Sequence, residues 1–335
     1  MKKRFYIITT FILAAATLTT SSCLKDPRAQ DFSNVGALVE LPLEAYNGVG
    51  ALVSEAFPIT TTAQDLPVVV NLASPKTLGS DLTVTLSVDQ AALDAYNTAN
   101  GLTTADGTAY SLPPSTSYSI SSLKVTIPAG KHTGTLHIAV TSSNLDPSGL
   151  YILPLTITDG GGQKISNYKT LLLNLQAKNQ YDMDYTATGY VFHPSAARSI
   201  DDTYRLATVG ASANQAPLAD LGPAANYYFN FTITPGAGNI ATLTNWVPVG
   251  STPAVPASGF MTLDNPAGVD YTASTDGATG LPPTDLPGGT KYNSTLFNNT
   301  YNSDTKTFMM HFGYAGGSTS QAGYTRQFYM KLVAQ

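Results

Sequence analysis

Carboxylate side chains are the first candidates for chemistry in this sequence, because a glycosidase needs two of them flanking the bond that it cleaves. The three glutamates, Glu40, Glu44 and Glu55, all lie within the first 55 residues, so the rest of the chain offers only aspartates. Asp201 and Asp202 are adjacent, and adjacent side chains on a strand point to opposite faces. The carboxylates therefore favour turn and surface roles over hydrolysis.

Histidines could hold a catalytic metal, but their spacing argues against it. His132 and His137 differ by an odd number and would face opposite sides of one strand, while His193 and His311 are isolated in sequence. The chain also has no Gly-x-Ser-x-Gly elbow, Walker loop or dinucleotide fingerprint. The sequence therefore predicts neither a metal site of this kind nor a cofactor.

Calcium is the one ion for which suitable oxygens come close together in the sequence. Asp264, Asn265 and Asp270 surround Gly268. Their spacing does not follow the EF-hand pattern, so a turn is the simpler interpretation of these residues.

Aromatic side chains are the remaining candidates, because sugars stack their C–H faces on rings and pair their hydroxyls with planar polar groups. Trp246, the only tryptophan, follows Asn245 in a segment rich in Pro and Thr, and Tyr271 follows Asp270. Tyr292 precedes another asparagine. We predict that these five residues contribute to a ligand-binding surface, with Trp246 in an exposed loop; burial in a core is the alternative for each ring.

The elements that would present these side chains begin with an export signal. Lys2–Arg4 are positive, Phe5–Leu18 form an apolar run too short to span a bilayer, and small residues precede Cys23. This pattern predicts a lipoprotein signal over residues 1–22, with Cys23 as the lipid-modified first residue of the mature chain. A plain secretory signal is the alternative, since Thr20 stands where lipoprotein signals usually carry Leu.

The charge balance excludes nucleic acid as a partner. Removal of the signal leaves 14 basic side chains against 22 acidic ones, a formal charge of −8, and phosphate binding requires a basic face. Charged residues make up only 12% of the chain, which suits uncharged, hydroxyl-rich ligands. Because no cysteine follows Cys23, no disulfide or thiolate metal site is expected in the folded part.

Residues 23–36 are expected to form a tether, and the pattern of the residues that follow predicts a series of short strands. Apolar residues alternate with polar ones over Leu82–Val88, Leu136–Val140 and Tyr151–Ile157, as in strands with one buried face. Two denser apolar runs, Pro67–Leu72 and Lys169–Leu175, are typical of central strands. We therefore predict an immunoglobulin-like sandwich of seven or eight antiparallel strands over residues 37–178.

One helix is expected within this sandwich. Residues 90–100 have helical spacing of apolar side chains, Asp89 can serve as the N-cap, and Gly101 follows where a helix would end.

The second half of the chain, residues 179–335, has its own strand pattern. Aromatic and aliphatic residues alternate over Tyr227–Ile233, Phe308–Tyr314 and Phe328–Leu332. Residues 235–290 are rich in Gly, Pro, Ala and Thr and predict long loops, where binding surfaces are commonly built. We expect a second antiparallel β domain, either a jelly roll or a small barrel, so the whole chain is predicted to be all-β.

A series of short motifs in the first domain resembles a known family. The motifs are Ala95-Tyr96-Asn97, Leu112-Pro113, Tyr118, Val125–Gly130 and Leu145–Leu155. Over residues 35–178 the chain resembles the N-terminal domain of Bacteroidota surface lipoproteins that are often encoded beside glycan-uptake systems of the starch-utilisation type. The resemblance implies an immunoglobulin-like module at the cell surface, in a family thought to act in glycan binding or adhesion, and it supplies no catalytic residue.

Together these observations predict a non-enzymatic lipoprotein of the outer membrane that faces the cell exterior and binds a polysaccharide or oligosaccharide. Partners would include the lipid anchor and other glycan-uptake proteins. Two alternatives stay open, namely an adhesin or envelope scaffold that binds proteins and, with less support, a glycoside hydrolase.

Overall fold

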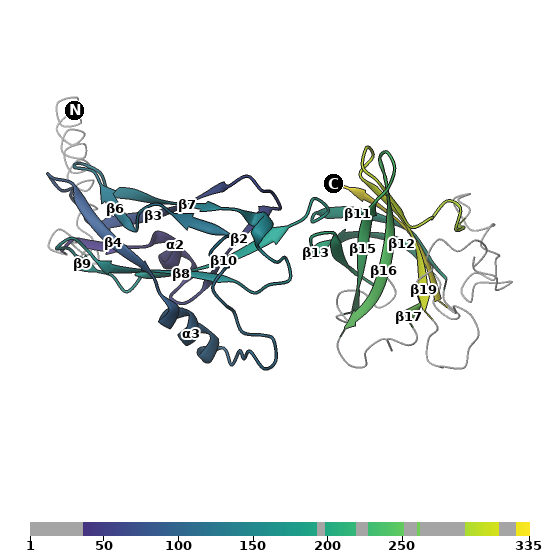
Figure 1. Cartoon of the computed structure of the whole chain (residues 1–335), viewed down its shortest axis with the longest axis horizontal. Coiled ribbons are helices and arrows are strands. Elements are labelled where there is room, and N and C mark those ends of the chain that lie inside the picture. The colour runs from purple at the N-terminus through teal and green to yellow at the C-terminus, as the bar shows by residue number, and fades with distance from the viewer. Residues whose placement is uncertain (1–35, 193–197, 219–226, 251–259, 262–291, 315–325) are drawn as a thin grey trace, which may run out of the picture.

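The computed structural model describes residues 36–192, 198–218, 227–250, 260–261, 292–314 and 326–335. The described chain is mostly β, as the sequence predicted. It also contains two short α-helices and one 3-10 turn, of which only the helix near residues 90–100 was predicted. Figure 1 shows two β bodies, one formed by strands β1 to β10 and the other by strands β11 to β20. The division of the chain into domains at residue 178 stays a prediction.

The first body contains two five-stranded sheets. In spatial order the first sheet consists of β5 (Tyr118–Ile120), β7 (Thr133–Val140), β3 (Gln64–Ala73), β1 (Leu38–Glu40) and β9 (Lys164–Ile165). The second consists of β2 (Leu52–Pro58), β10 (Thr170–Lys178), β8 (Ile152–Asp159), β4 (Leu82–Val88) and β6 (Lys124–Ile127). Their facing side chains form one hydrophobic core, which gives the predicted immunoglobulin-like sandwich, although with ten strands in place of the predicted seven or eight.

Both sheets are mixed, so the prediction of a purely antiparallel sandwich is wrong in this detail. β1 runs parallel to β9, and β2 runs parallel to β10. The reason lies in helix α2 (Pro42–Asn47), which carries the chain from β1 in one sheet to β2 in the other. A connection that crosses between sheets does not impose the antiparallel pairing that a hairpin does.

The burial of the strands follows what covers them. In β3, Val68, Val70 and Leu72 are buried while Val69 is 36% exposed. This central strand therefore has one solvent-exposed face, although its sequence is a dense apolar run. The sequence predicts that β8 has one solvent-exposed face. In the structure six consecutive residues, from Ile152 to Ile157, are buried, so both faces of this part of the strand are covered.

The cause is helix α3 (Gln90–Ala99), whose Leu93 packs on Ile152 and Leu172 outside the second sheet. The helix itself is confirmed. Asp89 caps it by accepting the backbone N–H of Ala92 at 3.2 Å. Gly101, with φ of 64°, follows its end.

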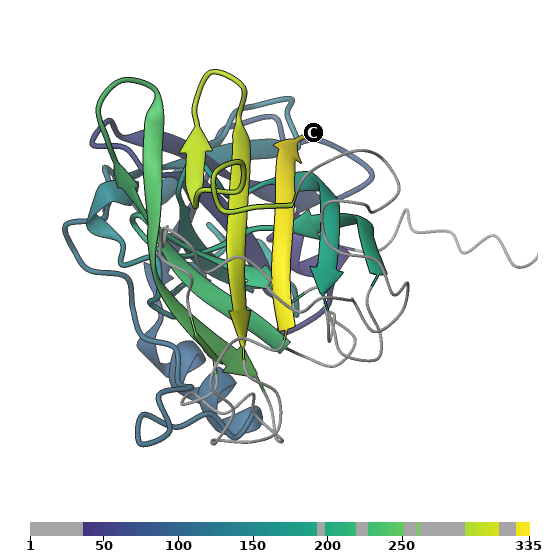
Figure 2. The ribbon, with the colours of Figure 1, turned by 90° about the vertical axis from the view of Figure 1, so that its right-hand side faces the viewer.

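The second body is one curled sheet rather than the two facing sheets of a jelly roll. Its strands, in spatial order, are β12 (Arg198–Arg205), β11 (Asp184–Phe192), β20 (Arg326–Ala334), β19 (Thr307–Tyr314), β18 (Thr300–Asn302), β16 (Ile240–Gly250), β15 (Tyr227–Pro235), β14 (Ala213–Pro217) and β13 (Ala207–Gly210); β17 (Phe260–Met261) pairs with β19. All of these pairs are antiparallel. The curl brings β12 and β14 close to each other, and Figure 2 shows the green and yellow strands following one another around it.

The curled sheet buries aromatic side chains on both faces. One face carries the larger cluster, which includes Phe229, Phe312 and Phe328. The other carries a smaller cluster of Tyr190, Phe192, Phe297 and Tyr329. The three alternating runs predicted as strands are confirmed as β15, β19 and β20.

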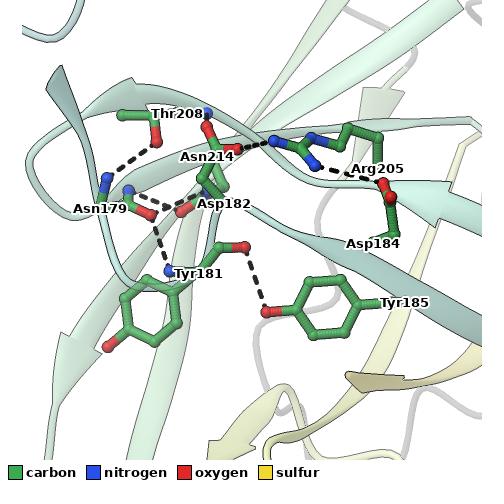
Figure 3. Close-up of polar contacts among 8 residues, drawn as sticks. All are labelled: Asn179, Tyr181, Asp182, Asp184, Tyr185, Arg205, Thr208 and Asn214. Atoms are coloured by element: carbon green, nitrogen blue, oxygen red, sulfur yellow. Dashed lines mark hydrogen bonds and ion pairs between the residues drawn. The ribbon is translucent and has the colours of Figure 1, made fainter. Parts of the chain in front are cut away.

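The segment that links the two bodies is fixed to the second one through Asn179. Its side-chain Nδ2 donates to the carbonyls of Gly210 and Ala213 and to Oδ1 of Asn214, while its Oδ1 accepts the N–H of Tyr181 at 3.0 Å. Figure 3 shows part of this network, in which Tyr185 also donates its hydroxyl to the carbonyl of Tyr181.

Candidate functional site

Among the described residues, a hollow with an aromatic wall lies on the first body, between helix α3 and the first residues of β10. We call it the α3 groove; its volume is about 460 Å³, within the range of small-molecule sites. Its lining consists of Glu44, Val49, Gly50, Ala92, Ala95, Tyr96, Ala99, Asn100, Asn167, Lys169, Thr170 and Leu172. Apolar side chains thus form most of the walls, with a few polar groups converging on them.

Tyr96 is held in place by contacts on the far side of α3. Its ring lies 5.8 Å from that of Tyr110 in an edge arrangement. The neighbouring Asn97 ties the loop to the helix, since its Nδ2 donates to the carbonyl of Tyr110 at 2.8 Å and its Oδ1 accepts the N–H of Tyr110 at 3.0 Å. The ring of Tyr96 therefore has a fixed position at the groove.

Glu44 is the buried polar group of the groove, with only 2% of its surface exposed. Its Oε2 accepts the backbone N–H of Thr170 at 2.8 Å. Burial raises the pKa of the Glu44 carboxyl, while hydrogen bonds from the backbone of Thr170 and Gly50 and the charge of Lys169 lower it less. Glu44 thus anchors α2 against β10 rather than projecting as a free carboxylate.

The exposed polar groups come from two directions. Asn100, at the end of α3, donates its Nδ2 to the carbonyl of Tyr96 at 2.8 Å. Asn167 and Lys169 lie opposite, on the exposed loop that leads into β10. Amide and ammonium groups on two sides of an aromatic ring form the arrangement that hydroxyl-rich ligands require.

A second hollow of about 290 Å³ adjoins the groove and shares Val49 and Asn167 with it. Leu38, Ile165 and Tyr168 contribute to its walls. Val49 is 69% exposed and Tyr168 37% exposed, so this region presents apolar surface to solvent. The two hollows are therefore neighbours on the first body.

Glu44 is the only carboxylate among the residues that line the two hollows, whereas glycoside hydrolysis requires two. Within the described ranges, no three His, Cys, Asp or Glu side chains gather as a metal site would require.

Trp246 does not lie in an exposed loop, so that prediction is wrong. It belongs to β16 and is 6% exposed. Its indole stacks on Phe229, Phe231 and Phe312, with ring centroids 5.1 to 5.4 Å apart. Its Nε1–H is buried without a hydrogen-bond partner. Trp246 is therefore part of the core of the curled sheet.

Two of the other predicted residues, Asn245 and Tyr292, lie within the described part of the chain. Asn245 is exposed at a β-bulge with φ of 53° and donates weakly to Thr232. Tyr292 packs on the smaller aromatic cluster, 5.6 Å from Tyr190. That cluster lies on the opposite face of the sheet, because it contains Tyr329 whereas the Trp246 cluster contains the adjacent Phe328.

Tyr271, Asp270 and the calcium candidates Asp264 and Asn265 lie outside the described residues, as do Cys23 and the signal.

Little in the sequence indicates the α3 groove. Glu44 lies on a helix that was not predicted, and Asn167 and Lys169 lie far from α3 in the chain. The residue that could have indicated the groove is Tyr96, because it belongs to both the predicted helix and the Ala95-Tyr96-Asn97 motif.

A family model described as an N-terminal domain matches residues 32–164, which is less than half of the chain. None of the curated proteins matches the chain.

Solved structures from Bacteroides resemble the chain distantly. A Bacteroides ovatus protein of unknown function is 16% identical, with 89% of this chain and 93% of that chain covered and a TM-score of 0.48. An auxiliary nutrient binding protein from Bacteroides thetaiotaomicron is 16% identical over 85% and 91%, with a TM-score of 0.40. A candidate carbohydrate binding protein from Bacteroides ovatus is 10% identical over 89% and 82%, with a TM-score of 0.32. These TM-scores are too low to support an argument on function.

Among the described residues, no helix has the length and apolar character needed to cross a bilayer.

Proposed function

We propose that the protein is a lipid-anchored surface protein that binds carbohydrate without converting it, and that the α3 groove is its binding site. The observation that supports this most directly is the position of Tyr96, a fixed aromatic ring flanked by Asn100 and Asn167 in a largely apolar groove. A pyranose ring has an apolar face for the tyrosine and hydroxyls for the amides.

The proposed ligand is an oligosaccharide rather than a single sugar. The second hollow shares Val49 and Asn167 with the α3 groove, and Tyr168 offers another exposed ring there. A chain of sugars could occupy both hollows, so that each additional residue contributes contact area.

A binding role without catalysis is supported by the state of Glu44. Its carboxylate is buried and bonded to the backbone of Thr170, and no second acid lines the groove. Both inverting and retaining glycosidases use a pair of carboxyl groups, which the residues lining the groove do not provide.

The proposed location is the outer membrane, with the protein facing the exterior. It rests on the sequence pattern of residues 1–23, in which a charged segment and an apolar run precede Cys23. Labelled palmitate should enter the wild-type protein and should not enter Cys23→Ala; equal labelling of both proteins would contradict this location.

A glycan array probed with the chain from residue 24 onward tests the binding activity. We expect retention on a restricted set of oligosaccharides, with no release of reducing ends after long incubation. Uniform failure to bind any glycan would contradict carbohydrate binding, and release of reducing ends would contradict the non-catalytic role.

A protein partner is a second candidate, and the exposed apolar residues favour it. Tyr46 is 89% exposed on α2 and Val49 is 69% exposed two residues after the helix. Such residues are common at protein interfaces. A negative array together with capture of an envelope protein that is lost in Val49→Ser would favour an adhesin or scaffold over carbohydrate binding.

A further inference from the structure

A third pocket, distinct from the α3 groove and from the hollow beside it, lies where β10 ends and the second body begins. We call it the junction pocket; its volume is about 350 Å³. Residues from both bodies line it, among them Ser148, Leu150, Gln176, Lys178, Arg205 and Thr208. Polar and apolar groups contribute comparably to its walls, unlike the mainly apolar α3 groove.

The lining of this pocket also contains an acidic residue, Asp182, whose carboxylate already has partners. Asp182, only 12% exposed at its side chain, pairs with the guanidinium of Arg205 through one oxygen and accepts the backbone N–H of Thr208 at 2.9 Å through the other. Arg205 also reaches Asp184 at 3.5 Å, as Figure 3 shows. Both oxygens of Asp182 thus have donors, and neither needs a further cation.

Lys178 has no such partner. Within the described part of the chain its ammonium forms neither an ion pair nor a hydrogen bond, although the residue is half-buried at the end of β10. Arg205 is shared by Asp182 and Asp184, so Lys178 is the cationic residue of the pocket lining that pairs with no carboxylate among the described residues. A half-buried cation of this kind gains most from an anionic ligand.

Another part of the lining is a hydrogen-bonded turn that contains Ser148 and offers an oxygen acceptor. Asp146 accepts both the hydroxyl and the N–H of Ser148, at 2.7 and 2.9 Å, which lowers the pKa of its carboxyl. A side chain at Gly149 would come within 2.4 Å of the ring of Tyr151, so the turn packs tightly against that ring. Because the Ser148 hydroxyl donates to Asp146, its lone pairs can accept from a ligand hydroxyl.

We propose that the junction pocket binds a small hydroxylated carboxylate, with a uronic acid as the representative class. The carboxylate would pair with Lys178, the ligand hydroxyls would pair with Ser148 and the amide of Gln176, and Leu150, which is 37% exposed, would contact the apolar ring face. The proposal does not depend on the α3 groove or on its ligand.

Titration calorimetry of the full chain in detergent tests this site, with glucuronate and galacturonate as probes. We expect binding of at least one of them, with affinity reduced about tenfold or more in Lys178→Gln, because a charge-assisted contact is lost. Lys178→Arg keeps the charge and should retain most of the affinity. Failure of both uronates to bind, or equal binding by Lys178→Gln, would overturn the proposal.

Three controls separate this site from general charge effects. Lys164→Gln removes a lysine of similar type from β9, outside the pocket lining, and should leave affinity unchanged. Glucose should bind about tenfold more weakly than glucuronate because it lacks the carboxylate, and acetate about tenfold more weakly because it lacks the hydroxyls. Loss of affinity in Lys164→Gln, or equal affinity for acetate and glucuronate, would overturn the proposal that the junction pocket binds a hydroxylated carboxylate.

Discussion

The carboxylate of Glu44 accepts the backbone N–H of Thr170 across 2.8 Å, although the two residues are 126 positions apart. This bond fastens α2 to β10 and forms the polar floor of the α3 groove. Burial raises the pKa of Glu44, so the folded state holds this proton more tightly than the unfolded state.

The pH dependence of stability should carry the signature of this shift. Because the pKa of Glu44 is raised, its contribution to the free energy of unfolding is fully present below the unfolded-state pKa of about 4.3. This contribution is lost as the pH rises through the pKa of the folded state. Glu44→Gln removes the titration. Chemical denaturation from acidic to neutral pH should therefore show a fall in the free energy of unfolding for the wild type relative to Glu44→Gln. A constant difference between the two proteins would contradict the raised pKa.

Trp246 should behave as a core residue. Trp246→Ala removes the ring that stacks on three phenylalanines and should lower the free energy of unfolding by about 3–5 kcal/mol. Trp246→Phe should cost less, because it keeps a ring and removes an indole N–H that has no partner. Thermal unfolding measures both. Equal stability of Trp246→Ala and the wild type would contradict a core role for Trp246 and would make it a candidate for the ligand-binding surface again.

Asn179 should contribute far more to the free energy of unfolding than the neighbouring Gln180. Asn179→Ala leaves the buried groups that its side chain bonds, including Asn214 and the N–H of Tyr181, without their partner and should cost about 2 kcal/mol or more. Gln180 is exposed and provides the matched control, since Gln180→Ala removes a neighbouring amide side chain and should change stability by less than about 0.5 kcal/mol. Similar values for the two variants, measured by urea unfolding, would show that the network in Figure 3 contributes little.

The shared lining of the two neighbouring hollows predicts a dependence of affinity on ligand length. Affinity should rise from a disaccharide to a longer oligosaccharide of the same type, because the longer ligand reaches the second hollow. Tyr168→Ala should reduce this gain without changing affinity for the disaccharide. Calorimetry with a length series checks both statements, and an affinity independent of length would limit the site to the α3 groove.

Strands and the helix with local signals were predictable from the sequence. α3 has its cap at Asp89 and its stop at Gly101, and β15, β19 and β20 alternate regularly. β16 was not predicted because a bulge at Asn245 interrupts its alternation, so that Leu243 and Trp246 are both buried although they are three residues apart.

The candidate site could not be predicted, because it is assembled from distant segments. Glu44, Tyr96 and Asn167 come from α2, α3 and the loop before β10, and only the parallel pairing of β2 with β10 and the packing of α3 on β8 bring them together. Local pattern carries no information on such pairings, so reasoning from aromatic residues in Pro-rich segments pointed to Trp246 instead.

The most direct test of carbohydrate binding in the α3 groove compares two substitutions of one residue. Calorimetry with an oligosaccharide retained on the array should give an affinity for Tyr96→Phe close to that of the wild type, because the ring is kept. Tyr96→Ala should lose about tenfold or more while remaining folded by circular dichroism. Unchanged affinity in a folded Tyr96→Ala would show that the ligand binds elsewhere.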